Sequence, residues 1–172
     1  GAGVFSLRLI EGLKKEMGIE TIVFTTEGNK KLYKEIFKIR REIKKCDVVH
    51  ALDGYPYGVI AYLASFGLHK KIIITAVGSG AIIHLYKWPH SFLLKRAYRS
   101  AEKVIAISNF TKNEILKKIP NLAIEVINHG VDFNKFSTRQ NFQAQNIGLY
   151  ILSVGSLRWR KGYHRSIEAF SI

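Results

Sequence analysis

Apolar positions along the chain alternate between helical and strand-like spacing. Residues 4–17 place Leu7, Ile10, Leu13 and Met17 three or four positions apart, which predicts a helix that Gly18 ends. β-Branched runs predict strands at 19–26, 47–52, 70–80, 102–108, 123–132 and 149–157. Amphipathic runs predict further helices at 29–45, 55–67, 86–100, 109–119 and 162–172.

This alternation predicts an α/β fold with a Rossmann-like, mostly parallel sheet and helices on both faces. Parallel strands need crossover connections, and those crossovers are right-handed. Ligands of such sheets bind beyond the carboxyl ends of the strands. The loops expected there are 1–3, 52–56, 77–82, 108–111, 129–133 and 156–162. Three of them are glycine turns, whose backbone N–H groups favour phosphate.

Composition supports a globular domain and narrows the compartment. The chain has 172 residues, of which 47% are hydrophobic, so it can form a sizeable core. The single cysteine, Cys46, excludes an internal disulfide and fits a reducing compartment. The longest apolar run, 72–83, is too short to span a bilayer, and no secretory signal is visible at the N-terminus. We therefore expect a cytoplasmic protein.

Charge is the unusual feature of the composition. Lys and Arg number 27 against 13 Asp and Glu, which gives a net charge of +14. Such a field favours an anionic partner: nucleic acid, an acidic membrane surface or phosphorylated small molecules. The expected helix 29–45 carries eight of these cations beside Glu35 and Glu42. Its outer face is either an ordinary solvated surface or a contact with anionic lipid.

Metal and nucleophile signatures are missing from the sequence. The histidines are scattered, no His/Cys/Asp cluster has ligand spacing, and G-x-S-x-G does not occur. We expect no metal and no cofactor. His50 and His84 are interpreted as structural histidines, whereas His129 occupies a turn that could face a cleft.

Six segments, in order, resemble glycosyltransferases of family 4. They begin with "GAGVFSLRLIEGLKKEMGIETIVFTT" and "CDVVHALDGYPYGVIAYLASFG", followed by "IIITAVGSG" and "RSAEKVIAISNFTKNEI". The last two, "VINHGVDFNKF" and "ILSVGSLRWRKGYHRSIEAF", are the strongest pair. The resemblance implies the N-terminal half of a two-domain GT-B enzyme that transfers sugar from a nucleotide-sugar donor with retention of configuration.

The same resemblance implies a domain organisation. Residues 1–136 would form the acceptor-side domain without its first strand, and 137–148 would be a linker. Residues 149–172 would supply the first strand and helix of the nucleotide-sugar-binding domain. The chain ends before the base and ribose contacts and the paired glutamates of the family. We expect a hexosyltransferase-type enzyme at full length and no activity from this fragment alone.

The resemblance also implies the donor-side residues. The nucleotide-sugar, such as a UDP- or GDP-sugar, leaves as a diphosphate, and Lys161 matches the lysine that contacts it in the family. The family's arginine position holds Ser156, so Arg158 or Arg160 on the same loop would supply that charge. Gly3 would approach the phosphates through its backbone. The catalytic residue stays unassigned.

On the acceptor side, the resemblance places Gly78, Ser79, His129, Gly130 and Asp132 along the cleft. The acceptor would be a glycan or a lipid-linked sugar, and an anionic membrane surface is a candidate partner. Family members carry Thr-x-His/Arg-Gly-Ser-Asp where this chain reads "TAVGSG". Val77 thus replaces the basic residue and Gly80 the acid of the family motif.

A binding module is the alternative reading. A basic Rossmann-like domain could hold nucleic acid or an anionic membrane without catalysis, but no helix-turn-helix, zinc-finger or aromatic RNA-binding signature is present. We therefore expect no specific nucleic-acid partner. A sheet without its central strand exposes pairing edges, so we also expect a homodimer or strand exchange.

Overall fold

The computed structural model describes residues 2–25, 35–133, 151–155 and 157–171. The chain divides into two compact units, Gly1–Gly130 and Val131–Ile172, and each is described by itself. The predicted linker 137–148 lies outside the described residues, so the predicted domain boundaries stay a prediction.

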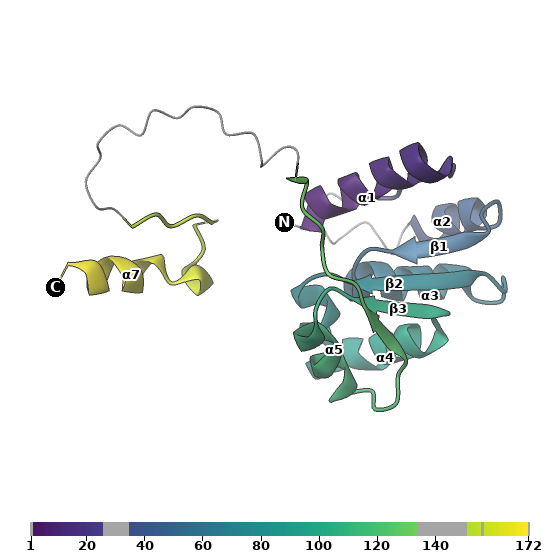
Figure 1. Ribbon diagram of the computed structural model, residues 1–172. Coiled ribbons are helices and arrows are strands. Elements are labelled where there is room, and N and C mark those ends of the chain that lie inside the picture. The colour runs from purple at the N-terminus through teal and green to yellow at the C-terminus, as the bar shows by residue number, and fades with distance from the viewer. Residues whose placement is uncertain (1, 26–34, 134–150, 156, 172) are drawn as a thin grey trace. The chain divides into compact units, whose positions relative to one another are not determined.

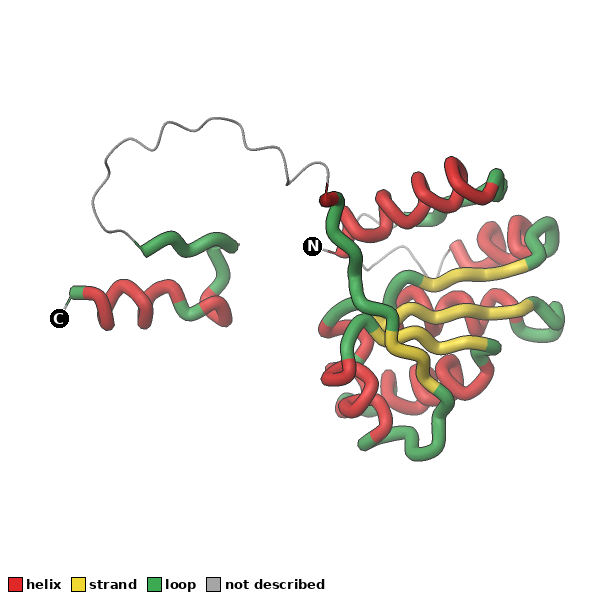
Figure 2. The backbone as a smooth tube through the Cα atoms, viewed as in Figure 1, coloured by secondary structure: helices red, strands yellow, loops and turns green. Residues whose placement is uncertain are grey.

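The first unit is built on a four-stranded parallel sheet. Its strands are β1 (Val48–Ala51), β2 (Lys71–Ala76), β3 (Lys103–Ala106) and β4 (Ile124–Val126). They pair in the order β1-β2-β3-β4, each parallel to the next (Figures 1 and 2). The predicted α/β class with a parallel sheet is therefore confirmed.

Helices connect and cover these strands. The helices of the first unit are α1 (Ala2–Met17), α2 (Ile36–Ile43), α3 (Val59–Ser65), α4 (His90–Ser100) and α5 (Asn109–Leu116). Short turns η2 (Gly54–Gly58), η3 (Ser79–Ala81) and η4 (Ile83–Tyr86) precede α3 and α4. Because the strand order is sequential and crossovers are right-handed, α3, α4 and α5 lie on one face of the sheet.

The main core lies between that face and these helices. Ile74, Ala76 and Val104 of the strands pack with Leu94 and Tyr98 of α4, all of them buried. A second cluster joins Ile39 and Ile43 of α2 to Ile60 and Ala64 of α3. The opposite face of the sheet is more polar: the His50 ring is hydrogen-bonded to Thr75 (2.8 Å), and Lys103 pairs with Glu125 (2.6 Å).

Two predicted strands do not form among the described residues. Residues 19–25 have no regular secondary structure, although Phe24 packs against the second cluster. Residues 151–155, expected to begin the second domain, also join no ladder. A β-branched run becomes a strand only when a neighbour supplies backbone partners, and the described residues offer these two segments none.

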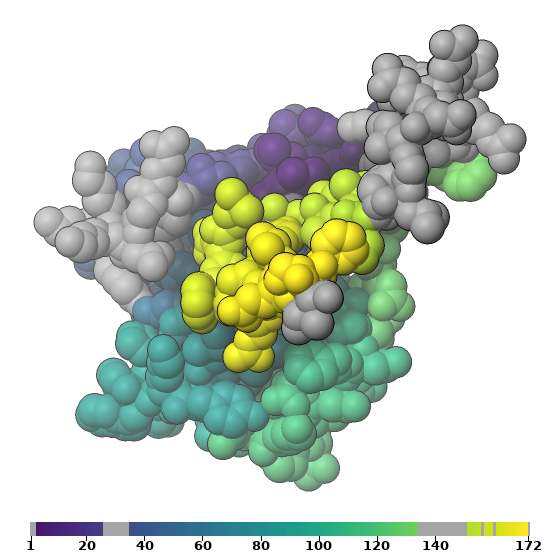
Figure 3. Space-filling view, turned by 90° about the vertical axis from the view of Figure 1, so that its left-hand side faces the viewer, coloured from purple at the N-terminus to yellow at the C-terminus, as the bar shows by residue number. Residues whose placement is uncertain are grey.

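The second unit contains a 3₁₀ turn, η5 (Trp159–Lys161), and α7 (Tyr163–Phe170), which confirms the predicted helix. None of its described residues is buried, and the side chains of Ile167 and Phe170 are mostly exposed. Figure 3 draws the atoms of α7 in yellow. Within the described parts of the chain, no helix is long and apolar enough to cross a membrane.

Candidate functional site at the carboxyl ends of the strands

The loops that follow β1 and β2 are tied together by the carboxylate of Asp53. Its Oδ1 accepts a hydrogen bond from the Gly54 N–H at 2.7 Å, and the Gly78 N–H also bonds this side chain. Burial raises the pKa of Asp53, while the two backbone N–H groups oppose that shift. The bonds fix the glycine turn after β2 relative to the end of β1.

Gly80 lies directly against this carboxylate. A Cβ atom at position 80 would come within 2.5 Å of the Tyr55 carbonyl oxygen and 2.6 Å of Asp53 Oδ2. The family motif has an acid at the position that Gly80 occupies, so the resemblance implied that this acid is missing. The structure shows that an acid does lie beside the glycine turn, supplied by Asp53 from the end of the neighbouring strand.

Tyr98 of α4 supports the same turn from the core. Its hydroxyl donates to the Ala81 carbonyl oxygen at 3.0 Å and lies against Gly54. Burial, followed by the charge of Asp53, raises the pKa of Tyr98, so the phenol stays protonated as a donor. Val77, in the position where the family motif has a basic residue, is itself buried in the core.

An aromatic and imidazole cluster lies on the outer side of the turn. Tyr55 stacks on His84 with ring centroids 4.0 Å apart, and His90 meets both rings edge-on, at 5.0 Å and 5.7 Å. Burial, then the charges of His90 and Lys87, lower the pKa of His84, whereas the Gly80 carbonyl opposes this. His84 Nδ1 is buried without a hydrogen bond of ordinary geometry among the described residues.

The ends of β3 and β4 reach the same edge of the sheet because all four strands are parallel. The Ser108 hydroxyl accepts from the Thr111 N–H at 3.2 Å and so caps α5. Asn128 donates to the Ile107 carbonyl oxygen at 3.0 Å, and the His129 ring stacks on Phe5 of α1 at 3.9 Å. His129 is thus engaged in a stack.

The other predicted cleft residues occupy several environments. Gly78 and exposed Ser79 belong to the turn 78–81, which Asp53 and Tyr98 hold in place and which we call the braced turn. Gly130 follows β4, with open space where a Cβ would be. Gly3 lies in the first turn of α1 rather than in a loop, again with open space around it. Asp132 is exposed and belongs to the second unit.

Two of the three predicted donor-side residues, Arg158 and Lys161, lie on one turn of the second unit, whereas Gly3 lies in α1 of the first unit. Arg158 and Lys161 are both exposed, and the Lys161 N–H donates to the Arg158 carbonyl oxygen at 2.8 Å. Gly162 follows with φ of 72°, a left-handed conformation that favours glycine. Trp159 stacks on His164 at 3.8 Å, which holds the turn against the start of α7.

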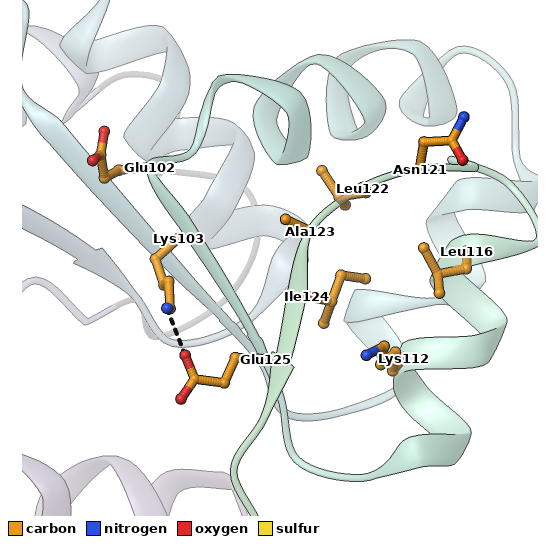
Figure 4. Close-up of a pocket in the computed structure, with 9 residues that line it drawn as sticks. All are labelled: Glu102, Lys103, Lys112, Leu116, Asn121, Leu122, Ala123, Ile124 and Glu125. Atoms are coloured by element: carbon orange, nitrogen blue, oxygen red, sulfur yellow. Dashed lines mark ion pairs between the residues drawn. The ribbon is translucent and has the colours of Figure 1, made fainter.

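An open hollow elsewhere in the first unit is lined by residues of α5, β3 and β4, among them Lys103, Leu116, Leu122, Ile124 and Glu125 (Figure 4). It lies at the amino ends of β3 and β4, where parallel sheets of this class do not bind their ligands. Across the described residues, no group of three or more His, Cys, Asp or Glu is placed to hold a metal ion. We therefore place the candidate site at the carboxyl ends.

Sequence reasoning missed Asp53, Tyr55, His90 and Tyr98 as site residues. The available signal was an acid followed by glycine directly after a buried strand, "HALDG". The contacts to Gly78, Gly80 and Tyr98 are long-range, so no local pattern predicts them.

Comparisons with known proteins point to glycosyltransferases. A model of Glycosyltransferase Family 4 matches residues 1–135. An uncharacterized glycosyltransferase of Methanocaldococcus jannaschii is 28% identical over 157 residues, which cover 91% of this chain and 40% of that protein. The chain therefore spans well under half the length of this relative. The family match covers most of the chain, including every strand of the sheet and the braced turn, and the chain belongs to glycosyltransferase family 4.

Proposed function

We propose that the intact protein transfers a sugar from a nucleotide-sugar donor to a glycan or lipid-linked acceptor with retention of configuration, as a hexosyltransferase-type enzyme. The observation that carries this proposal is the braced glycine turn at the carboxyl ends of β1 and β2, inside the family match. A rigid turn there suits the acceptor side, since the acceptor hydroxyl must be held at a fixed position beside the reacting carbon.

The donor side of the proposal rests on the turn Arg158–Gly162. Negative charge develops on the diphosphate as it leaves, and fixed cations with backbone N–H groups stabilise that charge. Lys161 and Arg158 are exposed on one short turn, and Gly162 leads directly into the first N–H groups of α7. This is the arrangement expected for a diphosphate contact.

The acid beside the turn has a positioning role in this proposal. Asp53 Oδ1 is engaged by the Gly54 N–H, and the carboxylate also receives the Gly78 N–H. Those bonds leave it suited to hold loop geometry rather than to attack the substrate.

The expected cytoplasmic location stays a prediction, which the single cysteine supports.

The test is a transfer assay on the intact protein with a panel of UDP- and GDP-sugars and hydroxyl acceptors. We expect release of nucleoside diphosphate with one class of donor, and NMR of the product should show the anomeric configuration of the donor. An inverted product would contradict the retaining mechanism. No turnover with any sugar nucleotide, together with tight binding of nucleic acid, would favour the binding-module alternative instead.

A further inference from the structure

Most of the segment between β2 and β3 carries positive charge without negative charge, and its one acid, Glu102, lies at its end. Residues 79–101 contain four Lys or Arg, two histidines and no Asp or Glu. This segment comprises η3, η4 and α4, which pack against one another in the first unit. A surface of this kind attracts anions.

Large apolar side chains project from the same stretch. The exposed fractions are 86% for Trp88, 56% for Phe92, 50% for Tyr86 and 45% for Ile83. The inner side of the stretch is anchored by side chains that are almost fully buried, Leu85 and Leu94. We call the outer side the aromatic strip, defined by Ile83, Tyr86, Lys87, Trp88, Phe92 and Arg96.

Cations are interleaved with the aromatic rings. The Arg96 guanidinium lies over the Phe92 ring at 4.8 Å, and Arg99 follows on the same face of α4. The Lys118 ammonium of the neighbouring segment lies over the Tyr86 ring at 4.1 Å. An acid that touches the strip, Glu114, accepts from the Tyr86 hydroxyl and is neutralised by Lys117.

We propose that the aromatic strip is a membrane-surface contact that binds anionic lipid. Trp and Tyr are the side chains that settle at the lipid–water interface, because one part of each is apolar and another is polar. Lys87, Arg96 and Arg99 are placed to pair with lipid phosphates while Trp88, Tyr86 and Phe92 enter the headgroup region. The inference does not depend on transfer activity.

Helix α2, together with the residues that directly follow it, is a weaker candidate for the same role. Arg40 donates to the carbonyl oxygens of Ala64 and Phe66 at 2.9 Å and 2.6 Å, so its guanidinium is already hydrogen-bonded within the fold. Lys45 pairs with Glu42 at 2.9 Å. One large apolar side chain, Phe37, accompanies exposed Lys38 and Arg41 there. This basic helix, for which the sequence left both a solvated surface and a lipid contact open, serves as a matched comparison.

The test is sedimentation of the intact protein with vesicles of phosphatidylcholine, with and without phosphatidylglycerol. Trp88→Ala should weaken binding to the anionic vesicles by roughly tenfold, as loss of one buried aromatic side chain implies. The pair Lys87→Gln/Arg96→Gln should weaken it by at least roughly tenfold, because each cation contributes about fivefold. Trp159→Phe in the second unit, and Lys38→Gln/Arg41→Gln on α2, are the matched controls and should bind as wild type does.

Trp88 also serves as a local reporter. In the Trp159→Phe protein, adding anionic vesicles should shift the Trp88 emission to shorter wavelength, and vesicles of phosphatidylcholine alone should not. The proposal is overturned if Trp88→Ala and Lys87→Gln/Arg96→Gln bind the vesicles like wild type, or if the α2 pair alone loses binding. It is also overturned if a DNA duplex displaces the wild-type protein, whose strip is unchanged, from the vesicles. An absent emission shift would also overturn it, since other segments would then cover the strip.

Discussion

Gly80 is a position where the site leaves little room for a side chain. A Cβ atom there would meet the Tyr55 carbonyl oxygen and the carboxylate of Asp53, and the carbonyl oxygen can move only with its backbone. Gly78, two residues earlier, has only Asp53 Oδ2 nearby, at an ordinary distance of 3.6 Å. Two glycines of one turn therefore have different structural requirements.

Gly80→Ala should destabilise the fold by about 1–3 kcal/mol, as overpacking of a close contact does. Gly78→Ala should have an effect within about 0.5 kcal/mol, because its backbone is extended and a methyl group fits. Urea unfolding of both variants measures the two values. Equal destabilisation by the two substitutions would contradict the described packing of the turn.

His84 makes stability depend on pH. Burial and the charges of His90 and Lys87 lower its pKa from the usual 6.5 in the folded state, so the unfolded chain binds more protons in the window below 6.5. Stability therefore rises with pH through that window and falls on acidification. His84→Phe keeps an aromatic ring on Tyr55 and removes the titration.

Between about pH 7.5 and about pH 5.5, wild type should lose more stability than His84→Phe, by less than about 1 kcal/mol because the ring is partly exposed. His50, whose pKa burial also lowers, leaves a residual slope of the same sign in the variant. Thermal melts across pH measure this, with exposed His69→Asn as control. A steeper slope in His84→Phe would contradict the sign.

At the scale of elements, a side chain caps the start of α5. The Ser108 hydroxyl accepts a hydrogen bond from the Thr111 N–H. Ser108→Ala should cost about 1 kcal/mol in urea unfolding. Ser100→Ala, whose hydroxyl donates to the Ala97 carbonyl near the end of α4, is the control and should cost clearly less. Equal costs would argue against the cap.

The periodicity of apolar residues was sufficient to predict the helices and the four paired strands. It failed at 19–25 and 151–155, where β-branched runs have no described neighbour to complete a ladder. Helix α1 was predicted correctly, yet Leu7 and Met17, placed on its apolar face, are exposed. Asp53 and its contacts escaped prediction because they join residues far apart in sequence.

At the scale of the molecule, the core belongs to the first unit. Every residue of both buried clusters lies within 1–130, and no described residue beyond Gly130 is buried. A protein of residues 1–130 should therefore unfold at the same urea midpoint as residues 1–172, within about 0.5 kcal/mol in free energy. A clear loss of stability in the shorter chain would show that the second unit contributes to the core.

In the proposed function the turn Arg158–Gly162 contacts the diphosphate of the donor, and Lys161 is the residue on which that proposal depends most. The most direct measurement compares the rate of nucleoside diphosphate release by the intact protein with that of its Lys161→Ala and Lys15→Ala variants. Lys15 is an exposed lysine of α1 and controls for the loss of one positive charge. We predict that kcat/KM for the donor falls by about a hundredfold in Lys161→Ala and is unchanged in Lys15→Ala. Equal rates for all three proteins would contradict the assignment of the turn to the diphosphate.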